Sequence, residues 1–176
     1  LVAAALLTRE LPGTGAFRAL YVIPWICSPL AVGVLWRWLL APTDGAISTL
    51  LDRRIEWLTD PTLALPVVSA VTVWTNVGYV ALFFVAGILA IPPQVLAAAS
   101  TDGANTWQRF WRITCPMLRP TFFFVSVTGI VSAAQVFDTV YALTGGGPAG
   151  RTDLVAHRIY AEAFGAAAIG RAAVMA

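Results

Sequence analysis

Three long apolar stretches, separated by shorter polar segments, dominate the pattern along the chain. The stretches run from about residue 17 to 40, from about 63 to 90 and from about 121 to 143. Because an α-helix rises about 1.5 Å per residue, each stretch is long enough to cross a hydrocarbon layer of about 30 Å. We therefore predict three membrane-spanning helices, with partial spans in the apolar runs at the two ends, residues 1–7 and 161–176. The sequence starts and stops inside such runs, and we expect it to be a fragment.

The segments between the predicted spans carry turn-forming residues. Residues 41–62 should contain a short interfacial helix over residues 47–58, where the apolar positions follow helical spacing. The glycines and proline at residues 145–148 should end the third span, and a helix should restart over residues 157–164. Kinks are expected at the prolines within the spans, which are Pro24, Pro29 and Pro66.

The amino-acid composition favours lipid over water as the surroundings of these helices. Of the 176 residues, 59% are hydrophobic and 11% are charged, and the mean hydropathy is +0.78. So few charges cannot cover a soluble globule with polar surface. The net charge of +2 comes without a basic patch interleaved with aromatic residues, which argues against a nucleic-acid partner. We expect a single domain, residues 1–176, that forms an all-α polytopic transmembrane bundle in contact with membrane lipid.

The mostly polar segment 91–120, between the second and third spans, predicts a helix-turn-helix. A first helix should run over residues 92–100 and a second over residues 104–113. The connection should break at residues 101–103, where Gly103 is free to adopt a left-handed backbone. The residues expected to cap and to stop the second helix are Thr101 or Asp102 at its start and Pro116 at its end.

Two interpretations of this segment remain open from its residues alone. The second helix carries aromatic bulk at Trp107, Phe110 and Trp111, and positive charge at Arg109 and Arg112. Such a unit could insert as a rigid body into a groove on a cytosolic partner. It could equally be an interfacial helix that lies on the lipid headgroups.

Two stripes of polar side chains follow helical spacing within the spans. The stripe of the second span consists of Ser69, Thr72, Asn76 and Tyr79, and that of the third consists of Thr128, Ser132, Gln135 and Thr139. Hydroxyl and amide groups beside an aromatic ring suit a neutral polyol, which forms many directional hydrogen bonds and carries no charge. For Ser69, Thr72 and Thr128 the other interpretation is that their hydroxyls hold neighbouring helices together.

Asp138 is the only acidic residue within a predicted span, and an intramembrane carboxylate is by default a functional candidate. At about 1.5 Å per residue it lies roughly 26 Å along the helix from Thr121, which is close to the outer interface. Two roles stay open from the residues alone. Asp138 either lines an external gate or pairs with Arg37 or with a donor in a loop.

The sequence contains no catalytic or metal-binding constellation. It has no phosphate-binding glycine loop followed by lysine, no nucleophile beside a base and no pair of buried carboxylates. Cys27 and Cys115 lack the spacing of a disulfide or metal motif, and the single histidine, His157, is expected at the surface. The chain is therefore not expected to be an enzyme or to hold a cofactor, and any ATP chemistry would belong to a partner.

Five motifs together resemble one protein family. Within the segment 91–120, the pattern consists of Ala97-Ala98-Ala99, Asp102-Gly103-Ala104 and Phe110-x-x-Ile113-x-x-Pro116. The other segments, in chain order, are LWRWLL at 35–40, Trp74 to Gly78, VFDTVYALTGGGP at 136–148 and IYAEAF at 159–164. They resemble the carbohydrate-uptake branch of the binding-protein-dependent ABC importer permeases, and the first pattern resembles the EAA loop of that family. The resemblance covers nearly the whole chain.

This resemblance implies the fold of a type I ABC importer permease, multi-pass in the cytoplasmic (inner) membrane, with the EAA loop in the cytoplasm. The implied partners are a second permease subunit, a dimer of ATP-binding subunits that binds ATP and Mg²⁺, and an extracytoplasmic substrate-binding protein. The residues implied to couple to the ATPase are Ala98, Ala99, Asp102, Gly103, Ala104, Phe110, Ile113 and Pro116. Those expected along the substrate path are Asn76, Tyr79, Ser132, Gln135 and Asp138.

One departure from the family pattern concerns docking. Ala97 stands where the family usually has the glutamate that pairs with a basic group of the ATPase, so docking would rest on shape and on Gly103, Phe110 and Ile113. An exposed ion pair contributes only about 0 to 1 kcal/mol, so its loss bears more on the mode of coupling than on coupling itself.

Two other functions compete with that of a carbohydrate permease. A permease for glycerol-phosphate or related polyol compounds should need a cationic lining, which the three spans do not show. A membrane scaffold or enzyme without a transport role would use segment 91–120 only to rest on lipid.

Overall fold

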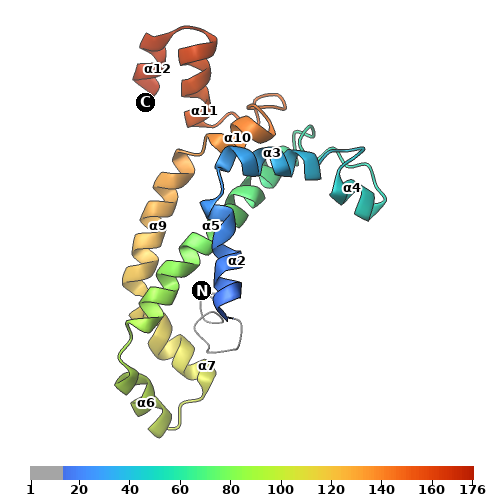
Figure 1. Cartoon of the computed structure of the whole chain (residues 1–176). Coiled ribbons are helices and arrows are strands. Elements are labelled where there is room, and N and C mark those ends of the chain that lie inside the picture. Colours follow the sequence, from blue (N-terminus) through green and yellow to red (C-terminus); the bar gives the residue numbers. More distant parts are fainter. Residues whose placement is uncertain (1–13) are drawn as a thin grey trace. The chain divides into compact units, whose positions relative to one another are not determined.

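The computed structural model describes residues 14–176, and every regular element in that range is a helix (Figure 1). The predicted partial span over residues 1–7 lies outside the described residues. Contacts within the chain group it into two compact units. The first unit contains the described residues up to Ile23 together with Val77–Ile130, and the second contains Pro24–Asn76 and Val131–Ala176.

Helix α5, Ala64–Leu89, confirms the helix predicted over residues 63–90. It is the one helix in the described range that is long and apolar enough to cross a membrane by itself, and up to three spans result if two bent helix pairs are each counted as one. Pro66 does not kink α5, because it lies in the first turn, where a backbone N–H has no partner within the helix.

The helix predicted over residues 17–40 is wrong as one continuous element. Helix α2 covers Thr14–Ile26, and helix α3 covers Pro29–Leu39. Between them Ser28 has an extended backbone, with φ −56° and ψ 125°. Proline disfavours the helical region for the residue before it, so Pro29 interrupts the helix at Ser28 and then starts the next one.

The helix predicted over residues 121–143 is also interrupted. Helix α9 covers Arg119–Ala134, and helix α10 covers Asp138–Leu143. No proline or glycine lies at this break. Instead Val136 packs against the core of the second unit, and the ring of Phe137 lies 5.0 Å from that of Tyr160. The interruption therefore follows from tertiary packing, which the periodic pattern of one segment does not show.

A small apolar core holds the first unit together. Its buried residues are Ala81, Phe84, Val85 and Leu118. The ring of Phe84 lies 4.8 Å from the ring of Phe122 on α9. Helix α2 approaches α5 so closely that a Cβ atom at Gly78 would overlap the backbone carbonyl of Tyr21. Glycine at this position thus lets two helix backbones touch.

The core of the second unit joins α3, α5 and α10. Its buried residues are Val32, Val68, Val71, Val140 and Leu143. At the contact of α3 with α10, a Cβ atom at Gly33 would overlap the side chain of Ala142. Because α10 packs directly on α3, the segment that leads into α10 is held beside the start of α3.

The interfacial helix predicted over residues 47–58 is shorter than expected. Helix α4 covers only Ala46–Leu51. Asp52 follows with a left-handed backbone, φ 48°, a region that aspartate tolerates better than most residues. The backbone N–H of Arg53 then donates to the carbonyl of Ser48, which closes the helix.

The C-terminal region consists of short helices rather than one continuous apolar rod over residues 161–176. Helix α11 covers Val155–Tyr160, the π-helical turn η2 covers Ala161–Gly165, and helix α12 covers Ile169–Met175. Arg171 and Glu162 form an ion pair of 3.3 Å across the reversal. The chain turns back at Ala167, which has φ 50°, so the apolar run does not continue as one rod.

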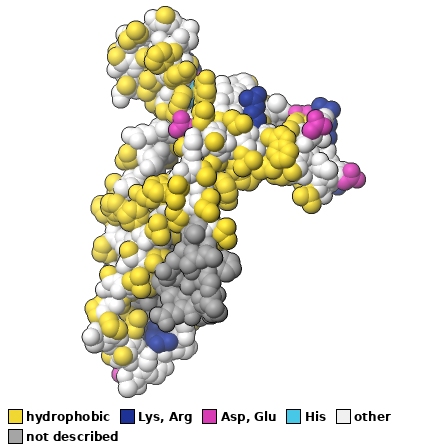
Figure 2. All heavy atoms as spheres, in the orientation of Figure 1, with side chains coloured by type: hydrophobic (Ala, Val, Ile, Leu, Met, Phe, Trp, Pro, Cys, Tyr) yellow, Lys and Arg dark blue, Asp and Glu magenta, His cyan; other side chains and the backbone are white. Residues whose placement is uncertain are grey.

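Large apolar side chains are exposed on several helices, as Figure 2 shows for α9 and α12. On α9 they are Phe122, Phe123, Phe124, Val127, Ile130 and Val131, and on α12 they are Ile169, Val174 and Met175. Contiguous apolar surface of this kind is unusual for a protein surrounded by water and is typical of a surface that contacts lipid or another subunit.

Candidate functional site

A cavity of about 190 Å³ lies within the second unit. It is formed where the end of α2, the start of α3, the first half of α5 and the break between α9 and α10 meet. Its lining residues are Trp25, Pro29, Thr72, Thr75, Asn76, Gln135, Val136, Phe137, Asp138 and Thr139. The interruptions of the two predicted spans at Ser28 and at residues 135–137 both occur at this cavity, so the breaks in the helices create its walls.

Three of the five residues predicted along the substrate path are brought together here. Asn76 of α5 lines the cavity together with Gln135 and Asp138, which lie at the break between α9 and α10. Tyr79 belongs to the first unit, where its ring packs edge to face on that of Phe83 at 4.9 Å. Ser132 is exposed on α9 and does not line the cavity.

Sequence reasoning missed Trp25, Pro29 and Thr75 as lining residues. Thr75 precedes Asn76 and follows Thr72 at a spacing of three residues, so the polar stripe itself contained the signal. Trp25 lines the cavity because the helix breaks at Ser28. Pro29 signals that break in the sequence, but the pattern does not show that a cavity opens beside it.

The polar side chains of α5 donate their hydrogens to their own helix. The hydroxyl of Thr72 donates to the carbonyl of Val68 at 2.8 Å, and that of Thr75 donates to the carbonyl of Val71 at 2.9 Å. The side-chain Nδ2 of Asn76 donates to the carbonyl of Thr72 at 2.9 Å. These bonds use the two hydroxyl hydrogens and one amide hydrogen, and they leave the hydroxyl and amide oxygens of these lining residues able to accept.

The same bonding bears on the other interpretation of the stripes. Ser69 donates to the carbonyl of Leu65 at 2.8 Å, and Thr128 donates to the carbonyl of Phe124 at 2.8 Å. Each of these hydroxyl hydrogens is used within its own helix, and only the hydroxyl oxygen is left to accept a bond from a neighbouring helix. A role of these hydroxyls in holding helices together stays a prediction.

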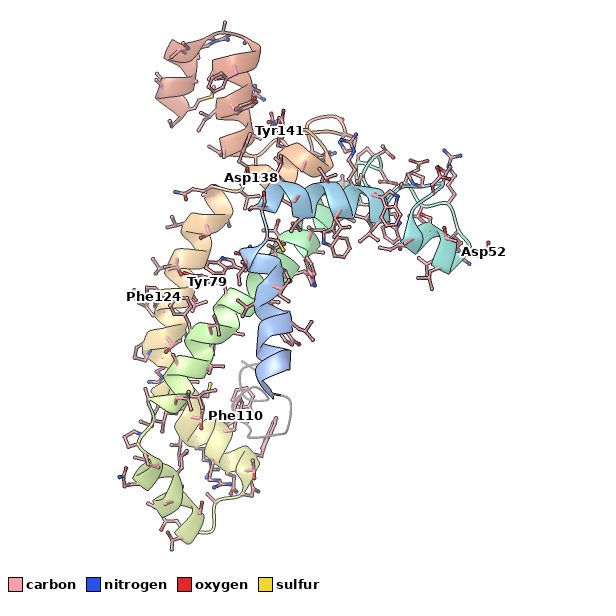
Figure 3. All side chains as sticks on the ribbon, viewed as in Figure 1. Asp52, Tyr79, Phe110, Phe124, Asp138 and Tyr141 are labelled. Atoms are coloured by element: carbon pink, nitrogen blue, oxygen red, sulfur yellow. The ribbon has the colours of Figure 1, made fainter. Side chains whose placement is uncertain are left out.

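Asp138 lies in the first turn of α10 and is exposed at the wall of the cavity (Figure 3). The predicted pairing with Arg37 is wrong, since none of the ion pairs among residues 14–176 includes Asp138. It is also not embedded in a continuous helix, because α9 ends at Ala134. Asp138 thus lies in the cavity wall, and its role at a gate or path stays a prediction.

The segment 91–120 forms the predicted helix-turn-helix in the first unit. Helix α6 covers Pro93–Thr101 and ends in a left-handed Gly103, with φ 78°. The N–H of Gly103 donates to the carbonyl of Ser100 at 3.1 Å, and the N–H of Ala104 donates to the carbonyl of Ala99 at 3.0 Å. This pair of bonds is the Schellman motif, so the predicted left-handed role of Gly103 is confirmed.

The predicted cap of the second helix is wrong. Helix α7 covers Thr106–Arg109, and its cap is Asn105. The N–H of Gln108 donates to Oδ1 of Asn105 at 2.8 Å, and the N–H of Asn105 donates to Oε1 of Gln108 at 3.0 Å. This reciprocal pair of bonds between Asn105 and Gln108 is a capping box. Thr101 cannot cap the second helix, because it is the last residue of α6 and its hydroxyl donates to the carbonyl of Ala97.

Pro116 does not stop the second helix. A π-helical turn η1 covers Phe110–Thr114, and helix α8 follows over Cys115–Met117. In η1 the N–H of Cys115 donates to the carbonyl of Phe110, five residues earlier. In a regular α-helix, the ring of Pro116 would clash with the carbonyl four residues earlier. The wider π-turn moves that carbonyl away from the ring, which explains how Pro116 is accommodated.

The residues predicted to couple to an ATPase lie on both limbs of this motif. Arg109 links the limbs, since its guanidinium donates to the hydroxyl of Ser100 at 2.6 Å. Of these coupling residues, Ala98, Asp102 and Gly103 are exposed. The others are partly or fully buried, namely Ala99, Ala104, Phe110, Ile113 and Pro116. Phe110, labelled in Figure 3, packs against the ring of Trp111 at 5.3 Å. The motif is therefore a stiff unit with an exposed edge of small residues.

The glycine-rich segment after α10 is tied down by buried polar contacts. The hydroxyl of Thr152, which is fully buried, donates to the carbonyl of Gly147 at 2.6 Å and lies 2.7 Å from the hydroxyl of Thr144. Gly146 has φ 83°, and a Cβ atom there would overlap the ring of His157. His157 is thus largely buried rather than a surface residue, which corrects the prediction.

We expect the contact between His157 and Asp153 to make stability depend on pH. The hydrogen bond of 2.8 Å between Asp153 and Nδ1 of His157 holds the pKa of Asp153 below its usual value. The bond from the guanidinium of Arg158 lowers this pKa as well, by a smaller amount. Stabilisation by such a carboxylate is present above its ordinary pKa of about 4 and is lost as the pH falls through the lowered value. His157→Ala should raise the pKa of Asp153 and flatten the acid limb of unfolding curves measured by circular dichroism across pH. Identical acid limbs in both proteins would contradict this expectation.

Comparison with known proteins adds a second line of evidence. A family model described as binding-protein-dependent transport system inner membrane component matches residues 2–176. The sn-glycerol-3-phosphate transport system permease protein UgpA of Agrobacterium fabrum is 39% identical over 160 residues, which cover 89% of this chain and 55% of that protein. The probable ABC transporter permease protein YesP of Bacillus subtilis is 37% identical over 181 residues, covering 98% of this chain and 58% of that protein.

Solved structures share the fold. A chain in the crystal structure of a bacterial alginate ABC transporter, in complex with an alginate pentasaccharide-bound periplasmic protein, aligns with a TM-score of 0.83 at 22% sequence identity. The alignment covers 99% of this chain and 63% of the other. The chain spans little more than half the length of the curated relatives that it matches.

Proposed function

The chain belongs to the family of binding-protein-dependent transport system inner membrane components, and from this membership we propose that the protein is the permease subunit of an ATP-driven importer. Its described part is all-helical and has the fold of chains in ABC importers of known structure. In this proposal the protein itself is not an enzyme, and a partner subunit binds and hydrolyses ATP. Residues 1–176 act as one transmembrane permease domain that is multi-pass in the cytoplasmic membrane.

The proposed partners of the protein are a second permease subunit, a dimer of ATP-binding subunits and an extracytoplasmic substrate-binding protein. The stiff helix-turn-helix of α6 and α7 supports the docking of an ATPase, because a rigid unit can transmit movement to the helices that it joins. Its exposed edge at Ala98, Asp102 and Gly103 presents small side chains, which suits docking by shape in the absence of a glutamate at Ala97.

The proposed cargo of the importer is a carbohydrate. The observation that carries this proposal is the cavity of the second unit, where Asn76 of α5 meets Gln135 and Asp138 from the break between α9 and α10. Polar groups that converge in a concave site bounded by aromatic rings are typical of sites for small polar ligands. Tyr79 and Ser132 remain proposed path residues outside this cavity. A membrane scaffold without a transport role would have no use for such a convergence.

Uptake measurements test this function. In cells that carry the full-length permease with its partner subunits, Asn76→Ala or Gln135→Ala should lower the initial rate of uptake of the transported sugar by about tenfold, because a hydrogen bond to the solute is lost. Radiolabelled sugars would identify the cargo. Ser69→Ala is the control, since Ser69 lies on the same helix as Asn76 but bonds to Leu65 and does not line the cavity. Unchanged uptake of every sugar in both cavity variants would refute the proposed path.

A further inference from the structure

We propose that the cavity of the second unit selects solutes that donate hydrogen bonds, such as neutral sugars, and rejects phosphate esters, with Asp138 as the residue that determines this choice. The proposal rests on the proposed function and deepens it, because it names the class of substrate that the same cavity accepts.

The first argument is that the wall formed by α5 is rich in acceptors. The hydroxyl hydrogens of Thr72 and Thr75 are donated to backbone carbonyls of the same helix, and one amide hydrogen of Asn76 is used in the same way. Their oxygens remain available to accept hydrogen bonds. A sugar hydroxyl can donate to such oxygens, whereas the phosphate group of an ester, as a dianion, carries only acceptor atoms. The hydrogen-bonding capacity of this wall therefore matches hydroxyl groups and mismatches a phosphate group.

The second argument concerns charge. Asp138 is the only charged residue among the described residues that line the cavity, and no arginine or lysine lies in this lining. Recognition of phosphate in proteins relies on charge-assisted bonds from arginine, lysine or clusters of backbone N–H groups. A carboxylate in the wall repels a phosphate and accepts strong hydrogen bonds from the hydroxyls of a sugar. One acidic residue thus favours the neutral solute and disfavours the anion at the same time.

The third argument concerns shape. The apolar part of the lining includes Trp25 and Phe137, whose ring systems suit the C–H faces of a sugar ring. At about 30 Å³ per water, a cavity of about 190 Å³ holds the volume of roughly six water molecules. This volume suits one small polyhydroxyl solute or one ring of a larger carbohydrate. Groups that stack and groups that accept hydrogen bonds are thus present in one site.

A thiol-protection experiment tests the proposal on the full-length permease assembled with its partner subunits in nanodiscs. Cys27 and Cys115 are replaced with serine, and Thr139→Cys places a single reporter thiol in the cavity wall. The rate of alkylation by N-ethylmaleimide is measured with a panel of neutral sugars and glycerol, each paired with its phosphate ester, including sn-glycerol-3-phosphate. We expect a neutral member to protect the thiol at a concentration about tenfold lower than its ester.

In Asp138→Asn, the neutral solute and its ester should protect the thiol at similar concentrations, because the substitution removes the charge of the side chain and keeps its shape. Asp52→Asn is the matched control: it removes an exposed carboxylate of the same unit that does not line the cavity, and asparagine tolerates the left-handed backbone there. In a second variant, Gln135→Lys, the added cation should reverse the preference toward the ester. This variant keeps the proposal testable if Asp138→Asn does not fold.

Three outcomes would overturn the inference. If an ester protects as well as its parent sugar, the cavity does not discriminate by charge, although the proposed path stands. If the preference for the neutral solute persists in Asp138→Asn or is unchanged in Gln135→Lys, the role of charge at this wall is refuted while the carbohydrate function stands. If no solute in the panel protects the thiol, the cavity is not a solute site, and the inference fails together with the proposed path.

Discussion

Replacing Gly103 with valine is expected to lower both the co-purification of the ATP-binding subunits and the rate of sugar uptake about five- to thirtyfold. Gly103 has φ 78°, and a left-handed backbone costs a side-chain-bearing residue about 1–2 kcal/mol, most of all a β-branched one. Nothing lies within 4 Å of a Cβ atom at this position, so the cost comes from the backbone alone. An energy of this size changes the population of the native turn by the stated factor.

The physical route from Gly103 to docking is the Schellman motif. If residue 103 leaves the left-handed region, the bonds from the N–H groups of Gly103 and Ala104 to Ser100 and Ala99 are lost. The bond from Arg109 to Ser100 would then be left to hold the limbs α6 and α7 at their angle. Affinity for the ATPase should fall because the docking surface is no longer preformed.

Gly129→Val is the matched control for this experiment. Gly129 also has open space around its Cβ position but has no left-handed backbone and lies within α9. The variant should co-purify with the ATPase at the level of the unmodified protein. Retention of the ATPase by Gly103→Val at that same level would show that the turn is not part of the coupling surface, and the proposed docking role of segment 91–120 would be refuted.

Gly78→Ala is expected to lower the free energy of unfolding of the purified permease by about 1–3 kcal/mol, even though alanine favours helices over glycine by about 1 kcal/mol. A Cβ atom at this position would overlap the carbonyl of Tyr21, and the neighbouring Val22 Cα lies 3.1 Å away. The obstacle is backbone of α2, so no flexible side chain can move aside. The helices must separate, and their packing contacts weaken along the whole crossing.

Thermal unfolding in detergent, followed by circular dichroism, measures this effect. Gly129→Ala is the control, because it makes the same substitution within a helix where nothing lies within 4 Å of the new Cβ atom. It should raise stability slightly through helix propensity alone. Equal shifts in the two variants would mean that α2 does not press against α5 at Gly78.

The sequence identified part of the candidate site, and the reason is visible in the residues. Asn76 was predicted because it follows Thr72 at helical spacing on a helix that is continuous in the structure. Tyr79 obeyed the same spacing but lies in the other compact unit, packed on Phe83. Helical periodicity shows which residues share a face of one helix; it does not show where along that face a cavity opens.

The loop between the second and third spans shows a similar division. The break at Gly103 was predictable, because a glycine after a short helix favours a left-handed terminus. The cap at Asn105 was missed, although Asn105 and Gln108 have the spacing of a capping box. The continuation through Pro116 depends on the π-turn before it, and no residue type in that turn signals the change in hydrogen bonding.

The sequence by itself determined that the chain is helical, where α5 runs, where segment 91–120 reverses at Gly103, and which family the chain resembles. These properties depend on local quantities, namely length, apolar content, turn chemistry and short motifs. The sequence also marked the interruption of the stretch 17–40 through Pro29. Only the tertiary structure decided that the stretch 121–143 is interrupted, and that Asn76, Gln135 and Asp138 meet at these interruptions. Their meeting depends on packing between residues that are far apart in the chain, such as Gly33 against Ala142, which no local pattern encodes.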